Sequence, residues 1–506
     1  MSNAVIPNKV NLVWFKKDLR VLDHEPLYRA VNEGLAVGLY IIEEDWLTSH
    51  ECSDFHKQFL KDSLSELKIE LEKRNVPLLI IKGEALSILT SLKEKLNFKT
   101  LLSHEETGLK WTYDRDLRVK EWCKENSVNW LESKQFAILR GLSNRDIWNK
   151  SRSKIIERDI ISGAVQNAKH NIKSEMDLSV LESSKRFDIL PGGTNAGVKT
   201  LQSFYAGRGE SYYKELSSPV TAFESCSRVS PYISWGNLSM TQVQESLTHQ
   251  RQKTETLPFE MKKNWSRSLR SFESRLWWHC HFIQKLESEP EIEFENVNRA
   301  FNGMREGSLN KSFLEAWEKG ETGYPIIDAC MRALIQKGWI NFRMRAMLVS
   351  FASYQLWIHW REQSHHLAKL FVDFEPGIHF NQLQMQSGVT GINSIRIYSP
   401  AKQTLDQDPE GEFIKKYCPE LKELDPKFLS KPWEAPPMIL KMADVELGEN
   451  YPMPIVDNKE SYNKAKDTVF EWRKKPEVIE EAKRVYQKHG SRKNKNFPKQ
   501  HRRTFQ

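Results

Sequence analysis

Residues 338–345 read Gly-Trp-Ile-Asn-Phe-Arg-Met-Arg, an apolar run follows to Trp360, and residues 373–388 read Asp-Phe-Glu-Pro-Gly-Ile-His-Phe-Asn-Gln-Leu-Gln-Met-Gln-Ser-Gly. Two arginines open this stretch, and the carboxylates Asp373 and Glu375 stand near its end. The intervening run is too apolar for a solvated surface, and a buried arginine needs a charged partner. The stretch therefore predicts a helical core with an ion pair, whose role the pattern alone leaves open between structure and function.

The composition is that of an ordinary soluble protein with an excess of basic and aromatic residues. The chain has 506 residues, enough for two or three domains, and a formal net charge of +8. Its 16 Trp and 24 Phe exceed what a core of this size needs, although plain packing explains any single Trp. The positive charge is compatible with a polyanionic partner but does not require one.

Six cysteines stand singly along the chain, with no Cys-x-x-Cys pair. This spacing argues against zinc ribbons, iron–sulfur clusters and a disulfide framework, and it indicates a reducing, cytoplasmic location. The first ten residues hold no apolar signal core, and no window approaches about 18 uninterrupted apolar residues. We therefore expect no membrane span.

Strand and helix patterns alternate through residues 1–135. Apolar runs predict strands at 10–15, 37–42, 78–81, 100–102 and 128–130, with helices near 25–32, 54–73, 87–96 and 114–125. Such alternation predicts an α/β domain with a doubly wound parallel sheet. No Gly-x-Gly-x-x-Gly follows the first strand, so the dinucleotide fingerprint is absent. A small ligand at the carboxyl ends of the strands would have charged neighbours, each more simply explained as a surface charge: Lys17, Arg20, Glu43 and Glu105.

The rest of the chain divides into a connector, a helical domain and a basic end. Residues 136–198 are polar and Gly-rich, which predicts an interdomain connection that wraps the surface. Residues 471–506 carry clusters of Lys and Arg, more simply a solvated or disordered tail than a nucleic-acid contact. Helical periodicity dominates residues 199–470, at 199–206, 239–250, 265–287, 312–318, 325–337, 342–360 and 364–372.

Two short motifs hold residues suited to ligand chemistry. Residues 226–231, Cys-Ser-Arg-Val-Ser-Pro, precede a predicted helix, where hydroxyls and free N–H groups suit a phosphate but also form common caps. His279 and His281 are two apart on a helix and face different sides, so we expect no metal site. The neighbouring Trp277 and Trp278 suit a lid over a planar ring or base.

Arg343 and Arg345 are also two residues apart and point to roughly opposite sides of their helix. One of them can hold a cofactor or an ion pair while the other faces a groove. The spacing predicts this division of labour without deciding which arginine does which.

Several segments match one family in the right order. They are residues 11–20 (Asn-Leu-Val-Trp-Phe-Lys-Lys-Asp-Leu-Arg), 227–232 (Ser-Arg-Val-Ser-Pro-Tyr), 316–329, 331–334, 338–339, 360–362, 396–403 and 411–414. Together they resemble the photolyase/cryptochrome flavoprotein family over essentially the whole chain. Collinear motifs are far more specific than any one of them, and the chain is identified as an atypical, bacterial-type member.

The resemblance implies an N-terminal α/β antenna-type domain and a C-terminal helical FAD-binding domain. The helical domain would hold a U-shaped FAD beneath a hole lined for a flipped DNA lesion. The family's repair reaction passes an electron from reduced, light-excited flavin to a pyrimidine dimer, and the protein supplies binding and orientation. A second, antenna chromophore is compatible with the resemblance, which does not identify it.

The cofactor residues follow position by position from the resemblance. Arg345 and Asp373 match the ion pair beside the isoalloxazine, and Glu375 stands where a second Asp is common. His379 falls where the family places the residue that faces flavin N5. A histidine there would titrate near neutrality and gate protonation of the flavin. If the local alignment shifts by two residues, Asn381 has that role instead. The full set assigned to the cofactor is Tyr213, Cys226, Ser227, Arg228, Ser230, His279, Arg345, Asp373, Glu375 and His379.

The residues expected to act in the reaction are partly kept and partly altered. Trp278 and Arg343 are kept as lesion contacts, and His379 would act on the flavin. Trp360 keeps the middle position of the family's three-tryptophan electron relay. The inner and outer positions fall at Leu383 and near Gly307, so the relay is broken. Photoreduction would then use another route, among Trp339, Tyr354, Trp357 and the 277–278 pair, or cellular reductants.

Other lesion contacts also depart from the family. Phe342, Ala346 and Met385 stand where enzymes for cyclobutane dimers usually have Asn, Met and Trp. Outside the lesion contacts, Ser227 and Ser230 match the family's phosphate-binding segment, in which Cys226 stands where Thr is usual. Enzymes for the (6-4) photoproduct use a histidine pair at the positions of Phe342 and Ala346. The absence of both histidines argues against that substrate by the family's usual mechanism.

The leading prediction is a monomeric deoxyribodipyrimidine photo-lyase that uses FAD and blue light to split cyclobutane pyrimidine dimers in DNA. The altered lesion contacts and the broken relay favour the alternative, a cryptochrome-type blue-light receptor without repair activity. A nucleotide-binding protein without photochemistry is a third hypothesis and would be colourless when purified.

Overall fold

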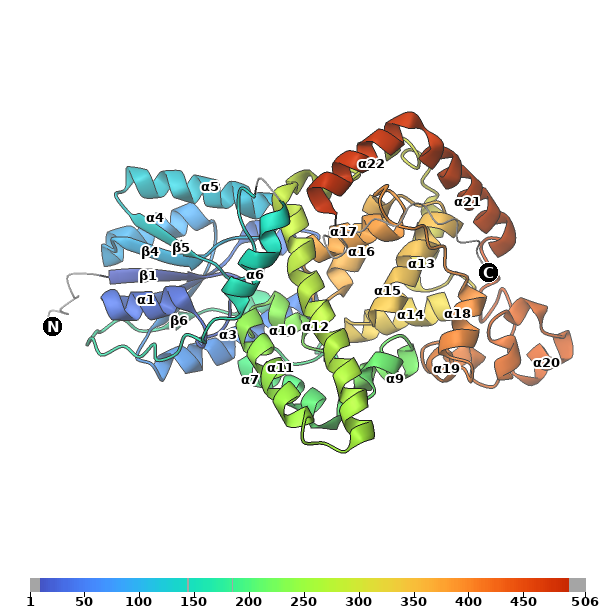
Figure 1. The fold of residues 1–506 in the computed structure, drawn as a ribbon, viewed down its shortest axis with the longest axis horizontal. Helices are drawn as coiled ribbons and strands as arrows, with labels where there is room; N and C mark the ends of the chain where they lie inside the picture. Colours follow the sequence, from blue (N-terminus) through green and yellow to red (C-terminus); the bar gives the residue numbers. More distant parts are fainter. Residues whose placement is uncertain (1–9, 143–144, 184, 491–506) are drawn as a thin grey trace.

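The computed structural model describes residues 10–142, 145–183 and 185–490, which form an α/β unit followed by a helical unit (Figure 1). The α/β unit is built on a six-stranded sheet in the order β5-β4-β1-β2-β3-β6, and every pair of neighbours is parallel. The predicted doubly wound parallel sheet is confirmed. Its strands are β1 (Val10–Phe15), β2 (Leu35–Ile42), β3 (Leu78–Lys82), β4 (Thr100–His104), β5 (Asn129–Ser133) and β6 (Glu175–Met176).

Helices cover both faces of the sheet, and the alternation along β1 shows why. Leu12 and Trp14 pack in one apolar cluster with residues of α4 (Ala85–Leu96) and α5 (Lys110–Glu125). Val13 and Phe15 belong to a second cluster with residues of α1 (Glu25–Glu33) and α3 (Asp54–Glu72). Successive side chains of a strand point to opposite faces, and both faces of β1 are buried. This arrangement is the physical basis of the nearly continuous apolar runs in the sequence.

The connector contributes regular structure that its sequence did not predict. β6 adds to the edge of the sheet, pairing Leu79 with Glu175 and Ile80 with Met176. Its two side chains are exposed, so the strand has no apolar alternation and is held by backbone hydrogen bonds. Within the same connector α6 (Trp148–Ile156) buries Trp148 against the protein.

Apart from one isolated β-bridge between Leu447 and Tyr451, the described regular structure after residue 193 is helical, as predicted. No helix in the described part of the chain combines the length and apolarity needed to cross a bilayer. The helices are α7 (Thr194–Ser203), α8 (Tyr212–Glu215), α9 (Pro219–Ser225), α10 (Ser230–Ser234), α11 (Met240–Thr254), α12 (Phe259–Ser288), α13 (Lys311–Lys319), α14 (Pro325–Lys337), α15 (Phe342–Ser350), α16 (Trp360–Leu370), α17 (Pro376–Gln386), α18 (Pro400–Gln407), α19 (Glu412–Tyr417), α20 (Pro437–Met442), α21 (Asn458–Lys474) and α22 (Pro476–His489), with α2 (Glu44–Thr48) in the α/β unit.

The single helix predicted over 342–360 is wrong. α15 ends at Ser350, a π-helical turn spans Phe351–Gln355, and α16 starts afresh at Trp360. The break follows from Trp357, whose φ of 55° lies in the left-handed region and cannot continue a helix. The imidazole of His359 then accepts from the N–H of Arg361 and caps α16. The helix predicted over 364–372 therefore begins four residues earlier.

The segment 471–489 is also helical rather than irregular. It completes α21 and forms α22, which turns back over the top of the helical unit (Figure 1). Glu289, at the end of α12, anchors α22 through ion pairs with Arg484, Lys488 and His489. The more distal basic clusters, 492–493 and 502–503, lie outside the described residues.

The basic loop after β1 locks the two units together. The backbone N–H of Leu19 donates to the carbonyl of Trp235 at 3.2 Å, and Arg20 Nη1 donates to the carbonyl of Gly236 at 3.0 Å. Arg20 is only 2% exposed, so its interpretation as a surface charge is wrong. Its guanidinium contacts mainly backbone oxygens, including that of Asp23. Burial of these bonds fixes the helical unit against the carboxyl end of the sheet.

Substitution of Gly236 tests this contact. Gly236 has a φ of +69°, and a Cβ there would lie 2.2 Å from the carbonyl oxygen of Lys17. Gly163 has a φ of +84° with nothing within 4 Å, so Gly163→Ala carries the backbone strain alone. We expect Gly163→Ala to lower the free energy of unfolding by about 1 kcal/mol and Gly236→Ala by about 3 kcal/mol or more in urea titrations. Equal losses in the two variants would contradict the close interdomain contact.

Candidate functional site

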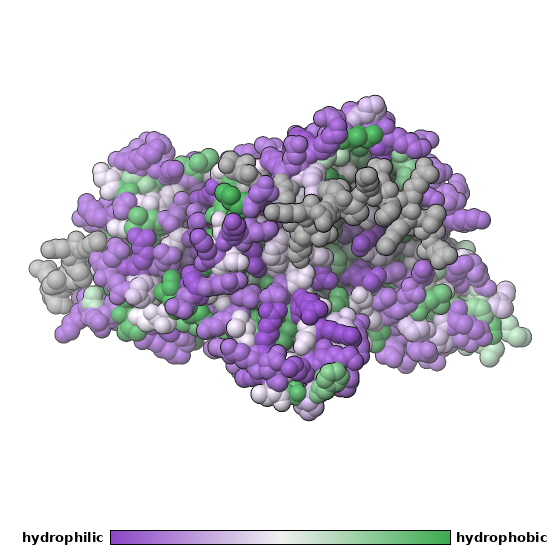
Figure 2. Space-filling view, viewed as in Figure 1, coloured by the Kyte–Doolittle hydropathy of each residue, from purple (hydrophilic) through white to green (hydrophobic). Residues whose placement is uncertain are grey.

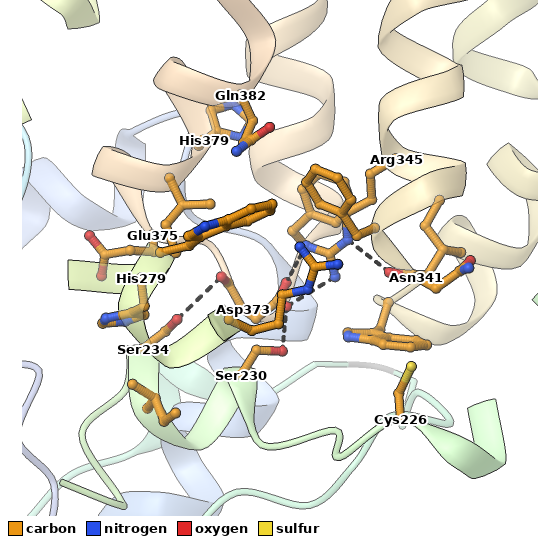
Figure 3. A pocket seen from close by; sticks show the side chains of 18 of the residues that line it. Cys226, Ser230, Ser234, His279, Asn341, Arg345, Asp373, Glu375, His379 and Gln382 are labelled. Atoms are coloured by element: carbon orange, nitrogen blue, oxygen red, sulfur yellow. Dashed lines mark hydrogen bonds and ion pairs between the residues drawn. The ribbon is translucent and has the colours of Figure 1, made fainter. Parts of the chain in front are cut away.

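A cavity of about 280 Å³ lies within the helical unit, between α10, α12, α15 and α17 (Figure 3). Its wall is largely apolar and aromatic, with a few convergent polar groups, which is the usual composition of a cofactor site. Most of the residues predicted for the cofactor line it. They are Cys226, Ser227, Arg228, Ser230, His279, Arg345, Asp373, Glu375 and His379, and the predicted lesion contact Trp278 joins them.

The ion pair predicted between Arg345 and Asp373 is present and bidentate. Arg345 Nη1 and Nη2 donate to the two carboxylate oxygens of Asp373, each at 3.0 Å. The arginine also donates from Nε to the carbonyl of Ile340 at 2.8 Å. Ser230 Oγ donates to Asp373 Oδ2 at 2.6 Å, which ties α10 to the pair. Because the fork geometry uses both oxygens, the pair fixes α15 relative to the loop before α17.

The segment before α10 presents polar groups to the cavity. Arg228 has a φ of 59°, and its guanidinium lies 4.0 Å from the ring centroid of Trp339. The left-handed backbone at Arg228 turns the chain, and the cation–π contact holds the side chain of this residue. Residues 226–230 line the cavity. Burial raises the pKa of Cys226 to about 12, so its thiol stays protonated and serves as a packing and weak hydrogen-bonding group.

Two histidines in the wall are neutral. Burial lowers the pKa of His279 and of His379 to about 3. His379 Nε2 lies 3.0 Å from the carbonyl of Ser364, so this nitrogen carries the proton and donates. The expectation that His379 titrates near neutrality is therefore wrong, and its charge cannot gate anything at pH 7. Asn381 does not line the cavity and donates to the carbonyls of Gly377 and Phe282.

The polar atoms of the wall fit a cofactor such as FAD. Within the described part of the chain, four buried polar atoms of the lining have no hydrogen-bond partner: Arg228 Nε, His279 Nε2, Asn341 Oδ1 and Glu375 Oε1. Buried polar atoms left unpaired are costly, so the cavity favours a ligand that offers both donors and acceptors. A ring system with an apolar body and polar edges, joined to a phosphate, meets that demand. The flavin dinucleotide has this chemistry.

Three predicted residues are not brought into the cavity. Tyr213 lies on α8, where its hydroxyl donates to Asn264 Oδ1 at 3.1 Å. Arg343 does not line the cavity, and its Nε is buried without a partner in the described structure. Trp360 is fully buried and donates from Nε1 to Asn296 Oδ1 at 2.7 Å. Arg345 is thus the arginine that makes the ion pair and lines the cavity, and the prediction that Arg343 faces a groove stays a prediction.

The altered positions partly surround the same cavity. Phe342, Ala346 and Leu383 line it, whereas Met385 does not. Sequence reasoning missed further lining residues, among them Arg275, Asn341 and Gln382. Asn341 lies inside the stretch 338–345, but an asparagine next to a helix start is so often a cap that its position gave no functional signal.

A smaller cavity of about 60 Å³ lies at the carboxyl ends of β1 and β2. Its lining includes Lys17 and Glu43 but neither Arg20 nor Glu105. Arg115 crosses this region and pairs with Glu106 Oε2 at 2.8 Å, as well as with Glu43. A small ligand at this edge of the sheet stays a prediction.

Asp18, His24 and His104 are buried together at the same edge, with potential metal-ligand atoms within 4.8 Å of one another. His24 Nδ1 accepts from the N–H of Leu27, so His24 Nε2 carries the proton that it donates to Asp18 at 2.9 Å. His104 Nδ1 lies 2.6 Å from the same carboxylate oxygen. This geometry is that of a hydrogen-bonded cluster, and the absence of a metal stays a prediction.

Comparison with known proteins gives consistent matches along the chain. Residues 11–139 match the family model described as DNA photolyase, and residues 272–471 match the FAD binding domain of DNA photolyase. The chain is 27% identical over 489 residues to a deoxyribodipyrimidine photo-lyase of Agrobacterium fabrum, covering 90% of this chain and 96% of that protein. It is 26% identical over 488 residues to a cryptochrome DASH of Synechocystis, covering 88% and 95%. A crystal structure of a bacterial class III photolyase from Agrobacterium tumefaciens superposes with a TM-score of 0.81 at 26% identity, covering 94% of this chain and all of that one.

Removal of the Arg345 side chain should empty the cavity of its ligand. In Arg345→Ala the carboxylate of Asp373, whose side chain is 5% exposed, would lose its bidentate partner. We expect the variant to purify with at least about tenfold less bound FAD and to lose about 3 kcal/mol of unfolding free energy. Arg345→Lys keeps the positive charge but loses the bidentate geometry of the guanidinium. Its FAD content and its unfolding free energy should lie between those of wild type and those of Arg345→Ala. Wild-type FAD content in Arg345→Ala, measured by visible absorbance, would show that the pair does not hold the cofactor.

Glu375 should make the apoprotein less stable as the pH rises. Burial raises its pKa from 4.5 to about 7, so the folded chain keeps a proton that the unfolded chain has lost. Stability therefore falls between about pH 4.5 and pH 7, by up to about 3 kcal/mol. Glu375→Gln removes this loss, and its advantage over wild type should grow from pH 5 to pH 8 in urea unfolding of the apoproteins. The exposed Glu410→Gln is the control, and a constant difference across pH would contradict the assignment.

Proposed function

The chain belongs to the photolyase/cryptochrome family, and from that premise we propose that it is a deoxyribodipyrimidine photo-lyase that uses FAD and light to split cyclobutane pyrimidine dimers in DNA. The observation that carries the proposal is one cavity that holds the Arg345–Asp373 pair and also the ring of Trp278. A cofactor fixed by the pair would then share a space with a base that stacks on Trp278.

Different residues of the cavity would bind the flavin and shield it from water. Arg345 and Asp373 would orient the flavin ring, and residues 226–230 would receive the phosphates at the start of α10. The flavin, when bound and reduced, supplies the light-driven electron transfer to the dimer. His379 would present an uncharged ring to it, since its pKa is lowered to about 3 by burial. The apolar remainder of the wall excludes water, which strengthens each polar contact.

Trp278 and Phe342 would receive the lesion. Their ring centroids are 6.4 Å apart, and both line the cavity. Extruding a damaged pair of bases costs less than extruding an intact pair because its stacking and pairing are already weakened. Aromatic faces and the neighbouring cation of Arg275 suit such bases.

A cryptochrome-type blue-light receptor is the second candidate, and Leu383 favours it. An aliphatic side chain lines the cavity where the resemblance expects the innermost tryptophan of the electron relay. The similarity to a cryptochrome DASH, almost equal to that to a photo-lyase, is compatible with this function. The two candidates differ in one outcome, the repair of DNA.

Illumination of the reduced protein with dimer-containing single- and double-stranded DNA tests the proposal. We expect light-dependent loss of dimers from wild type, and at least about tenfold weaker binding of the damaged DNA by Trp278→Ala with FAD retained. Trp472→Ala removes a half-buried tryptophan of α21 outside the cavity lining. This control variant should keep the wild-type repair of dimers and the wild-type affinity for damaged DNA. A yellow protein that leaves the dimers intact would favour the receptor, and loss of dimers in darkness would exclude both.

A further inference from the structure

One face of α12 is exposed and extends along the helix to the cavity. The helix is 30 residues long and buries Trp265, Leu269 and Phe272 on one side. Positions 263, 267, 270 and 278 fall on the opposite side within about a quarter of the helix circumference, because successive residues advance by about 100°. They are occupied by Lys263, Arg267, Arg270 and Trp278, and only Trp278 reaches the cavity wall.

The three cations of this face are available for a partner. Lys263, Arg267 and Arg270 are all exposed. Among the described residues, neither arginine has a carboxylate within salt-bridge distance, and Lys263 has only the 70% exposed Glu260 at 3.3 Å. Such an exposed pair contributes little. Figure 2 shows mainly hydrophilic side chains over the lower half of α12, where this segment lies.

Aromatic rings accompany the cations along the same line. The guanidinium of Arg267 lies 5.5 Å from the ring centroid of Tyr213, which the ammonium of Lys214 also approaches at 5.4 Å. Nearer the cavity, the guanidinium of Arg275 lies 4.4 Å from the ring centroid of Trp278 and 5.6 Å from that of Phe342. Phe342 is 37% exposed, which is unusual for a large apolar side chain beside a cavity.

We propose that these residues form a strand track: Lys263, Arg267 and Arg270 with Tyr213, continued by Arg275, Trp278 and Phe342, bind one strand of DNA and lead it along α12 to the cavity. The inference rests on the proposed function and adds the surface that approaches the substrate. It assigns Tyr213, which does not reach the cavity, to the DNA strand instead of the cofactor.

The chemistry of the track selects this occupant. Cations spaced along a line neutralise backbone phosphates, and aromatic faces between them stack bases without regard to sequence. From position 263 to position 278 the helix rises about 22 Å, enough for several nucleotides. An acidic protein surface would satisfy the cations but would leave the tyrosine, tryptophan and phenylalanine rings without a matching planar group.

Salt-dependent binding of a labelled oligothymidylate tests the track. The triple variant Lys263→Ala, Arg267→Ala, Arg270→Ala should bind the oligothymidylate at least about tenfold more weakly. The slope of log affinity against log salt concentration should also become shallower by about 2. Each single-strand phosphate that is no longer neutralised removes about 0.7 from this slope. The matched control is Lys95→Ala, Lys99→Ala, Lys120→Ala, three exposed lysines of the α/β unit that change the net charge equally. The control should keep the wild-type slope, and both variants should keep the wild-type FAD absorbance and melting temperature.

Each other result contradicts the track. A triple variant on α12 that binds like wild type would overturn it while leaving the proposed repair function intact. Equal weakening by the two triple variants would mean that net charge, and no particular surface, attracts DNA. A wild-type protein that binds neither the oligothymidylate nor damaged DNA would overturn the track and the proposed function together.

Discussion

The bidentate pair between Arg345 and Asp373 is the contact on which the helical unit depends. It joins α15 to the loop before α17, and Ser230 adds α10 to the same carboxylate. Two charges removed from water are stable only when each finds a well-oriented partner, so this geometry tolerates little movement. The apolar cavity can exist beside it because the charged groups satisfy one another and leave the remaining polar atoms of the wall for a ligand.

The rest of the architecture supports that geometry from outside. The loop after β1 buries Arg20 against the backbone of Gly236, and Asn237 donates to the carbonyl of Leu19. These contacts set α10 against the sheet, and the ion pair is therefore held by both units. On the far side, Glu289 keeps α22 over the end of α12. An unfolding event in either unit would loosen the cavity.

Sequence patterns predicted the sheet and a buried ion pair because each has a strong local cause, and the family resemblance identified the partners of that pair as Arg345 and Asp373. Parallel strands buried on both faces need continuous apolar runs, and an arginine in an apolar setting needs a carboxylate. The break before Trp360 and the edge strand β6 had no such cause: one depends on a left-handed backbone at Trp357, the other on backbone pairing alone. The neutral state of His379 likewise follows from burial, which only the folded structure reveals.

Hydrogen–deuterium exchange of the apoprotein with and without FAD tests most directly whether this cavity is the cofactor site. We expect FAD to slow exchange in residues 226–234, 341–346 and 373–386, the segments that converge on the Arg345–Asp373 pair. The exchange rates at the strand ends of the α/β unit should change far less. Slower exchange confined to the α/β unit, with these three segments unchanged, would contradict the assignment of this cavity to FAD.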